Sequence, residues 1–216
     1  MAYNIYLCVY YIYRRRINFI FMYDKIVVGI DQSYTRTGIS MVVDGKLVKV
    51  TSIPFKGCRN KSDKRKELKR ILTNIIVSNR QKANEFVILC ERIRTFSHHD
   101  TKGKEEEHGG AFISTDYIKA TGALIATIVD IAYEYEIDVF SVDTQSWKRR
   151  VLGNSKGNKI KGNKVEACQF IMKKGFDISS INTKGKVVYD DDAADSACIA
   201  LYAFIDPKLQ KLKKEE

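Results

Sequence analysis

Short apolar runs separated by turn residues predict three strands at the start of the folded part of the chain. Residues 26–31 read IVVGID, an apolar run that ends in an acid. Further runs at 39–43 and 47–52 flank Asp44-Gly45, a strong signal for a two-residue hairpin. We therefore expect an antiparallel meander of three strands.

Helices and strands are predicted to alternate after this meander. Apolar residues at helical spacing indicate helices over 62–78 and 112–135. Residues 86–91, FVILCE, are apolar without alternation, as in a strand covered on both faces, and they also end in an acid. The later predicted elements are a strand at 137–142, a short helix at 165–173 and a helix at 192–204.

The order of these elements indicates the fold class. Three strands precede alternating helices and strands, so we expect an α/β fold with a mixed sheet and helices on its faces. The polar segments 92–110 and 147–164 are predicted to be loops, the first of them solvated and the second basic.

The length of 216 residues suits one domain with a substantial core. We assign that domain to residues 24–206, with 1–23 as an N-terminal extension outside the fold and 207–216 as a basic, solvated tail. Residues 1–22 are aromatic and apolar, but three arginines interrupt them and the apolar part is too short to cross a bilayer. A segment lying on a membrane surface is the alternative; we prefer translation from Met22 and expect no stable membrane association.

The charge and the cysteines indicate the partner and the compartment. Lysine and arginine total 37 against 26 acids, a formal net charge of +11, which favours a polyanionic partner such as nucleic acid. The five cysteines are odd in number and form no CxxC pair, a pattern typical of reduced thiols in a cytoplasmic protein.

Four carboxylates form the candidate site: Asp31, Glu91, Asp192 and Asp195. The first two end apolar strands, and the last two are three residues apart, so in a helix they share one face. Carboxylates gathered at one edge of a sheet would repel each other unless cations lay between them, and Mg²⁺ prefers such oxygen ligands. Two ions could activate water and stabilise the leaving oxygen in phosphodiester hydrolysis. Taken singly, Asp31 could be a turn residue and Asp192 a helix cap.

Three segments resemble, in the same order, the acidic motifs of the RuvC family of Holliday-junction resolvases: GIDQSYTRTGIS (29–40), FVILCE (86–91) and DAADSACIA (192–200). WKRRVLG (147–153) with NKVEA (163–167) resembles the basic segment of that family, and the likeness spans residues 25–204.

The resemblance implies an RNase H-like three-layer fold with a mixed five-stranded sheet, a homodimer, and paired nicks across a four-way DNA junction. It implies that Asp31, Glu91, Asp192 and Asp195 bind two Mg²⁺ ions, with Mn²⁺ as an acceptable substitute. Other branched DNA belongs to the same expected class of substrates. A flap, R-loop or general branched-DNA nuclease of the same fold is the alternative.

The basic segment is predicted to contact DNA. Between residues 148 and 164 the chain has seven cations and no acid, and its glycines would let the backbone approach a phosphate. The cations expected at the DNA are Lys148, Arg149, Arg150, Lys159, Lys161 and Lys164. The resemblance singles out Lys148 and Lys164, and the alternative is a solvated loop.

Two departures from the family pattern affect the choice of substrate. The family often has an aromatic residue three positions after the glutamate; here that position is Arg94, and Phe96 follows two residues later. Both are predicted to contact DNA. The segment 153–164 is longer and more basic than in bacterial members, and in this respect the chain looks like the phage-encoded resolvases.

Other features of the sequence leave alternatives open. Asp143 could reach the site or cap the helix that follows, Asp190 and Asp191 are expected to lie outside the metal ligands, and Trp147 is expected to anchor the basic segment to the core. The segment 29–38 also resembles the first phosphate loop of actin-like ATPases and sugar kinases, but those proteins need a duplicated core. A non-catalytic DNA-binding protein of the same fold is disfavoured because all four acids are present.

Overall fold

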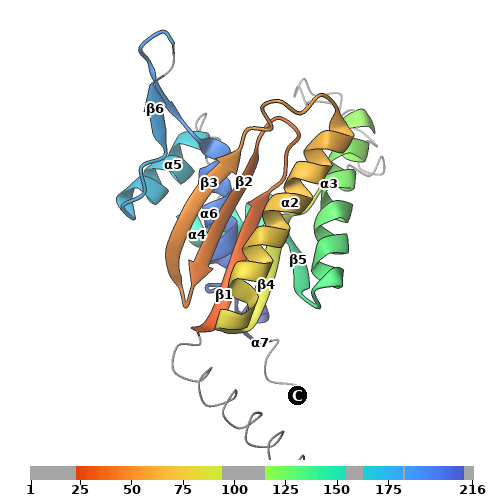
Figure 1. Cartoon of the computed structure of the whole chain (residues 1–216). Helices are drawn as coiled ribbons and strands as arrows, with labels where there is room; N and C mark the ends of the chain where they lie inside the picture. Colours follow the sequence, from red (N-terminus) through yellow and green to blue (C-terminus); the bar gives the residue numbers. More distant parts are fainter. Residues whose placement is uncertain (1–22, 94–114, 154–162, 182, 212–216) are drawn as a thin grey trace, which may run out of the picture.

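The computed structural model describes residues 23–93, 115–153, 163–181 and 183–211 (Figure 1). Five strands form one sheet in the order β3-β2-β1-β4-β5, with helices on both faces, which confirms the predicted fold class. The N-terminal extension up to residue 22 and most of the predicted loop at 92–110 lie outside the described residues.

The predicted meander is present. Strands β1 (Tyr23–Asp31), β2 (Thr37–Val43) and β3 (Lys46–Ile53) pair antiparallel, and β1 and β2 are in register with Asp31 opposite Gly38. Asp44 and Gly45 both have positive φ, 46° and 79°, which is the geometry of the tight hairpin turn that their sequence predicts.

Two parallel strands complete the sheet. Strands β4 (Ala83–Glu91) and β5 (Asp138–Val142) run parallel to β1, with Ile30 opposite Cys90. Because parallel strands end at one edge of a sheet, β1 and β4 finish side by side.

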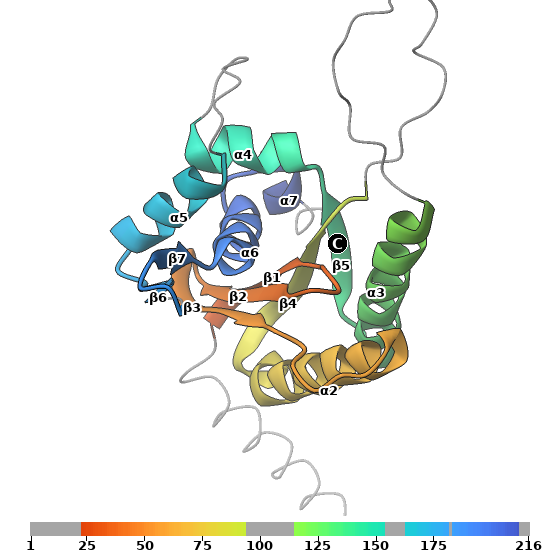
Figure 2. The same cartoon turned by 90° about the horizontal axis from the view of Figure 1, so that it is seen from above.

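The helices form two layers, one on each face of the sheet (Figure 2). Helices α2 (Lys61–Asn79) and α3 (Thr115–Glu134) cover one face, and the short helix η1 (Arg80–Lys82) leads into β4. The other face carries α4 (Thr144–Leu152), α5 (Asn163–Lys173), α6 (Asp191–Tyr202) and α7 (Pro207–Lys211). Among the described residues, no helix combines the length and apolarity needed to cross a membrane.

The apolar core is divided by the sheet. In β1, Ile26, Val28 and Ile30 pack with α2 and α3, whereas Val27 packs with α6. Both faces of β1 and β4 are therefore buried, which explains why their sequences show continuous apolar runs.

Three regions differ from the sequence prediction. Residues 147–152, predicted as loop, belong to α4, where Trp147 and Val151 are buried four residues apart. A small hairpin, β6 (Ser179–Ile181) and β7 (Val187–Tyr189), was not predicted; all of its strand residues are exposed, so no buried face imposes a pattern on them. At the C-terminus, residues 207–211 form α7, and Leu209 packs on the core where a solvated tail was expected.

Candidate active site

Asp31 and Glu91 lie at one edge of the sheet because their strands stay in register up to their ends. The last residue pair between β1 and β4 is Ile30 with Cys90, directly before the two acids. Gln32, only 5% exposed, then continues the pairing with its side chain. Its amide nitrogen donates to the carbonyl oxygen of Glu91 (2.5 Å), and its amide oxygen accepts from the Glu91 N–H (3.1 Å). Gln32 therefore fixes the backbone of Glu91 beside the end of β1.

Two glycines bring α6 into close contact with the sheet. A Cβ atom on Gly38 would lie 1.9 Å from the carbonyl oxygen of Asp192, and one on Gly29 would lie 2.2 Å from that of Ser196. Neither position has room for a side chain. Since Gly38 is the residue opposite Asp31, this contact sets the first turn of α6, including Asp192, at the same edge of the sheet.

A buried pair of hydroxyls fixes this packing. The Ser40 and Ser196 oxygens are 2.7 Å apart, and the Ser196 hydroxyl donates to the carbonyl oxygen of Ala193 (2.8 Å). Both serines are fully buried, so their hydrogen bonds specify how α6 is seated on β2.

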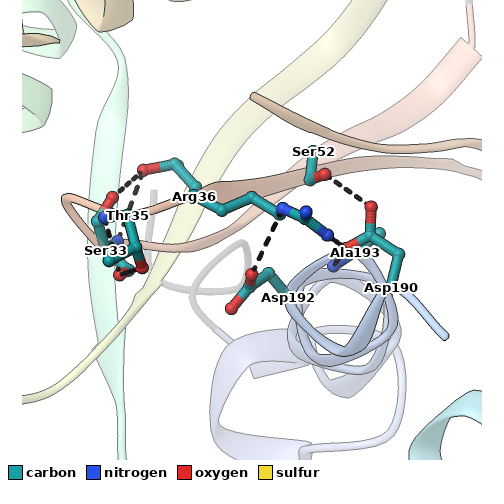
Figure 3. Close-up of polar contacts among 8 residues, drawn as sticks. Ser33, Thr35, Arg36, Ser52, Asp190, Asp192 and Ala193 are labelled. Carbon is teal, nitrogen blue, oxygen red and sulfur yellow. Dashed lines mark hydrogen bonds and ion pairs between the residues drawn. The ribbon is translucent and has the colours of Figure 1, made fainter. Parts of the chain in front are cut away.

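Asp190, not Asp192, caps α6 (Figure 3). The Asp190 carboxylate accepts from the Ala193 N–H (3.1 Å) and from the Ser52 hydroxyl (2.5 Å), and it lies 3.6 Å from the Arg36 guanidinium. Arg36 also approaches Asp192, with Nε 3.9 Å from Oδ2. The cap leaves Asp192 in the first turn of α6, on the side of Arg36 (Figure 3).

The charges of three of the predicted acids all act on the fourth, Asp31. The pKa of Asp31 is raised well above its ordinary value, first by burial and then by the negative charges of Glu91, Asp195 and Asp192. A side-chain hydrogen bond with Glu91 raises it further. The three elements β1, β4 and α6 thus place their acids within reach of one another's charge.

Two buried thiols respond to the same negative charge. Burial and then Glu91 raise the pKa of Cys90 to about 11. Burial and then Asp195 raise the pKa of Cys198 as well. As predicted, no disulfide joins the cysteines within the described ranges, and these two thiols are kept protonated at neutral pH.

Glu91 has a second neighbour at the start of α4. The Thr144 hydroxyl donates to Oε1 of Glu91. The adjacent Asp143 caps α4, since its carboxylate accepts from the N–H groups of Gln145 (2.9 Å) and Ser146 (3.3 Å). Of the two roles considered for Asp143 from the sequence, the structure shows the cap.

The donor set suits a hard divalent cation. Four carboxylates supply oxygen ligands of the kind that Mg²⁺ prefers, and the like-charge repulsion that raises the pKa of Asp31 is the repulsion that cations would relieve. In the parts of the chain that the structure describes, no three ligands already have the spacing of a formed metal site. The assignment of the four acids as metal ligands therefore stays a prediction.

The predicted DNA contacts are spread over several environments. Lys148 lies over the Trp147 ring (5.2 Å to the centroid), and Trp147 is fully buried, as expected of an anchor. Arg149 is exposed on α4. Arg150 instead pairs with Asp206 (3.5 Å). Lys164 lies in α5, and its side chain is not described; Lys159, Lys161, Arg94 and Phe96 lie outside the described residues.

Arg36, Gln32 and Thr144 were not singled out by the sequence interpretation. The one available signal was that Gln32 and Thr144 directly follow acids at strand ends, where side chains reach the edge of the sheet. Their partners lie 59 and 53 residues away in the chain, so the contacts themselves were not predictable.

Two solved structures of RuvC from Thermus thermophilus are similar to this chain. RuvC in complex with a Holliday junction substrate gives a TM-score of 0.57 at 13% identity, covering 83% of this chain and 93% of that chain. A second RuvC structure gives 0.54 at 12% identity, covering 86% and 96%. At these identities the likeness concerns the fold. No protein-family model and no curated protein sequence matches the chain.

Proposed function

We propose that this protein is a Mg²⁺-dependent endonuclease that hydrolyses phosphodiester bonds in four-way junctions and other branched DNA. The observation that carries the proposal is that β1 and β4 end side by side in Asp31 and Glu91, while the first turn of α6 packs against Gly38 at the same edge of the sheet. In keeping with this, the charges of Glu91, Asp192 and Asp195 all raise the pKa of Asp31. Such a concentration of negative charge on a chain of net charge +11 suits a site that recruits cations and acts on a polyanion.

In this proposal the four acids hold two Mg²⁺ ions. The ions, when bound, supply an activated water and stabilise the leaving oxygen. The protein's own part is to position the ligands: Gln32 fixes the backbone of Glu91, and Thr144 orients its carboxylate. Arg36 holds Asp192 near Asp190 and places a cation at the rim, where a phosphate would arrive.

Branched DNA is proposed as the substrate on two grounds. The fold is that of RuvC, one structure of which is a complex with a Holliday junction substrate. The motifs that resemble the RuvC family span residues 25–204 of this chain. Paired nicks require two active sites, so we propose a homodimer of the nuclease domain, residues 24–206, related to the phage-encoded resolvases and acting in the cytoplasm.

The kinase-like alternative is not favoured by the fold. Actin-like ATPases and sugar kinases need a duplicated core, whereas the described residues form a single five-stranded sheet and one small hairpin. The flap or R-loop nuclease has the same chemistry, and the choice of substrate distinguishes it from a junction resolvase.

The test compares a four-way junction, a flap and a linear duplex of the same sequence, each with Mg²⁺ or with EDTA. We expect symmetrical nicks in the junction, dependence on Mg²⁺, and loss of cutting with retained binding in Asp31→Asn. Gln145→Ala, an exposed change on α4, is the matched control and should cut normally. Undiminished cutting by Asp31→Asn would reject the proposed active site. Faster cutting of the flap than of the junction would identify the flap as the preferred substrate.

A further inference from the structure

Helices α2 and α3 lie side by side on the face of the sheet opposite α6 (Figure 2). Side chains of both helices line a groove with a volume of about 300 Å³. Its lining residues are Ser62, Arg65, Lys66, Lys69, Thr127 and Asp130. The four from α2 lie within two turns of the helix, three or four residues apart from one turn to the next, and so share one side of it.

The groove is strongly cationic. Three of its six lining residues are cations, and Asp130 is the one carboxylate among them. The surrounding segment, residues 56–70, contains eight cations and two acids. Neighbouring cations repel one another, and a bound polyanion would relieve that repulsion.

Of the three cations that line the groove, only Lys69 is in an ion pair with another described residue. Lys69 pairs with Glu134 (2.5 Å) and Arg70 with Glu67 (2.7 Å). Within the described part of the chain, by contrast, Arg65 and Lys66 form no ion pair. Arg65 is oriented by a hydrogen bond from its Nε to the Thr127 hydroxyl (2.8 Å), so its guanidinium is held at the groove.

The groove adjoins the edge of the sheet that carries the candidate active site. Lys64 donates to the carbonyl oxygen of Tyr34 (2.8 Å), in the loop that follows Asp31. Burial raises the pKa of the Tyr34 phenol and the positive charge of Arg65 opposes this, so Arg65 is also close to that loop. A backbone that leaves the active site on this face would meet the first turns of α2.

We propose that the α2–α3 groove binds the phosphate backbone of DNA, with Arg65 and Lys66 as the contacting cations. This inference rests on the proposed function. It adds a second contact surface, because the basic residues of α4 lie on the opposite face of the sheet (Figure 2). DNA at the active-site edge would then be held from both faces, as suits a substrate whose arms leave in different directions.

The test measures binding of a four-way junction in EDTA across a range of salt concentrations. The double variant Arg65→Gln/Lys66→Gln should bind roughly tenfold more weakly near 0.1 M salt, with a slope of log affinity against log salt smaller by about two, close to one for each lost phosphate contact. The matched control is Lys46→Gln/Lys49→Gln, which removes the same charge from exposed positions of β3. It should change the affinity by less than about twofold, because only general attraction is reduced.

Two further variants separate charge from folding. Arg65→Lys/Lys66→Arg keeps both charges and should keep the affinity. Lys66→Gln alone should lower the slope by about one without touching the Arg65–Thr127 hydrogen bond. Unchanged affinity in the double Gln variant, or an equal loss in the β3 control, overturns the proposal. Because no cleavage is measured, a failure of Asp31→Asn to abolish cutting would reject the nuclease site and leave this result standing.

Discussion

Gln32 uses its side-chain amide to hydrogen-bond both the N–H and the carbonyl oxygen of Glu91, as a neighbouring strand would do. This pairing occurs directly after β1 ends at Asp31. The side chain replaces the lost backbone partner, and a buried amide satisfies two main-chain groups that would otherwise lack hydrogen bonds. The relative position of Asp31 and Glu91 therefore depends on a third residue.

Replacement of Gln32 by alanine should weaken both stability and cutting. Two partly buried main-chain groups of Glu91 would lose their partners, so we expect a loss of about 1–3 kcal/mol in the free energy of unfolding. We also expect a fall of about 10- to 100-fold in cleavage rate, typical of groups that position metal ligands. Denaturant unfolding and single-turnover cleavage measure the two effects. Gln145→Ala, the same change at an exposed site, should stay within about 0.5 kcal/mol of the natural protein.

Gly38 should not tolerate a side chain. The added methyl group of Gly38→Ala would meet the carbonyl oxygen of Asp192 and force the start of α6 away from the sheet. We expect a loss of roughly 1–3 kcal/mol in stability and a loss of cleavage. In Gly122→Ala the new methyl group would come no closer than 3.8 Å to a neighbour and would lie within α3. That control should be neutral or stabilised by up to about 1 kcal/mol. Equal melting temperatures for the two variants would contradict the close contact of α6 with β2.

The stability of the metal-free protein should depend on the ionisation of Asp31. The pKa of Asp31 is higher in the folded than in the unfolded chain, so the folded state holds the proton longer. The stabilisation from this group is therefore present below its ordinary pKa and is lost as the pH rises through the raised value. In EDTA, Asp31→Asn should be more stable than the natural protein at neutral pH, and the difference should shrink as the pH falls.

Addition of Mg²⁺ should reverse this order at neutral pH, because cations would relieve the repulsion only where Asp31 is present. Melting temperatures measured from pH 5 to 8, with EDTA or with Mg²⁺, test both expectations. If Mg²⁺ raised the melting temperature of the natural protein no more than that of Asp31→Asn, Asp31 would not be a ligand.

Arg149 and Arg150 are adjacent but should have separable roles. Arg150 pairs with Asp206, whose side chain is only 7% exposed, and lies over the Tyr202 ring. Arg150→Ala should therefore lower stability by roughly 1–2 kcal/mol, a value limited by the 41% exposure of Arg150. Arg149→Ala should leave stability within about 0.5 kcal/mol and weaken junction binding about threefold. Denaturant unfolding and salt-dependent binding should separate the two variants: Arg150→Ala should mainly lose stability, and Arg149→Ala should mainly lose affinity for the junction. The same losses in both variants would contradict the assignment.

The fold was largely accessible from the sequence because its signals are local. The helical spacing of apolar residues, the Asp44-Gly45 turn and the apolar runs of β1 and β4 are each read from short stretches of the chain, and all correspond to elements of the structure. The helix α4 was missed because three consecutive cations dominate its sequence, although Trp147 and Val151 mark a buried side.

The sequence by itself determined which predicted strands end in acids, and hence the expectation that Asp31 and Glu91 lie at one edge of the sheet. Only the tertiary structure decided which of the clustered aspartates caps α6, that Gln32 joins the ends of β1 and β4, and that Arg150 is occupied by Asp206. The physical reason is the range of the interactions. Periodicity reports whether a residue is buried, whereas a partner more than fifty residues away is fixed by strand register and by the seating of α6 on two glycines.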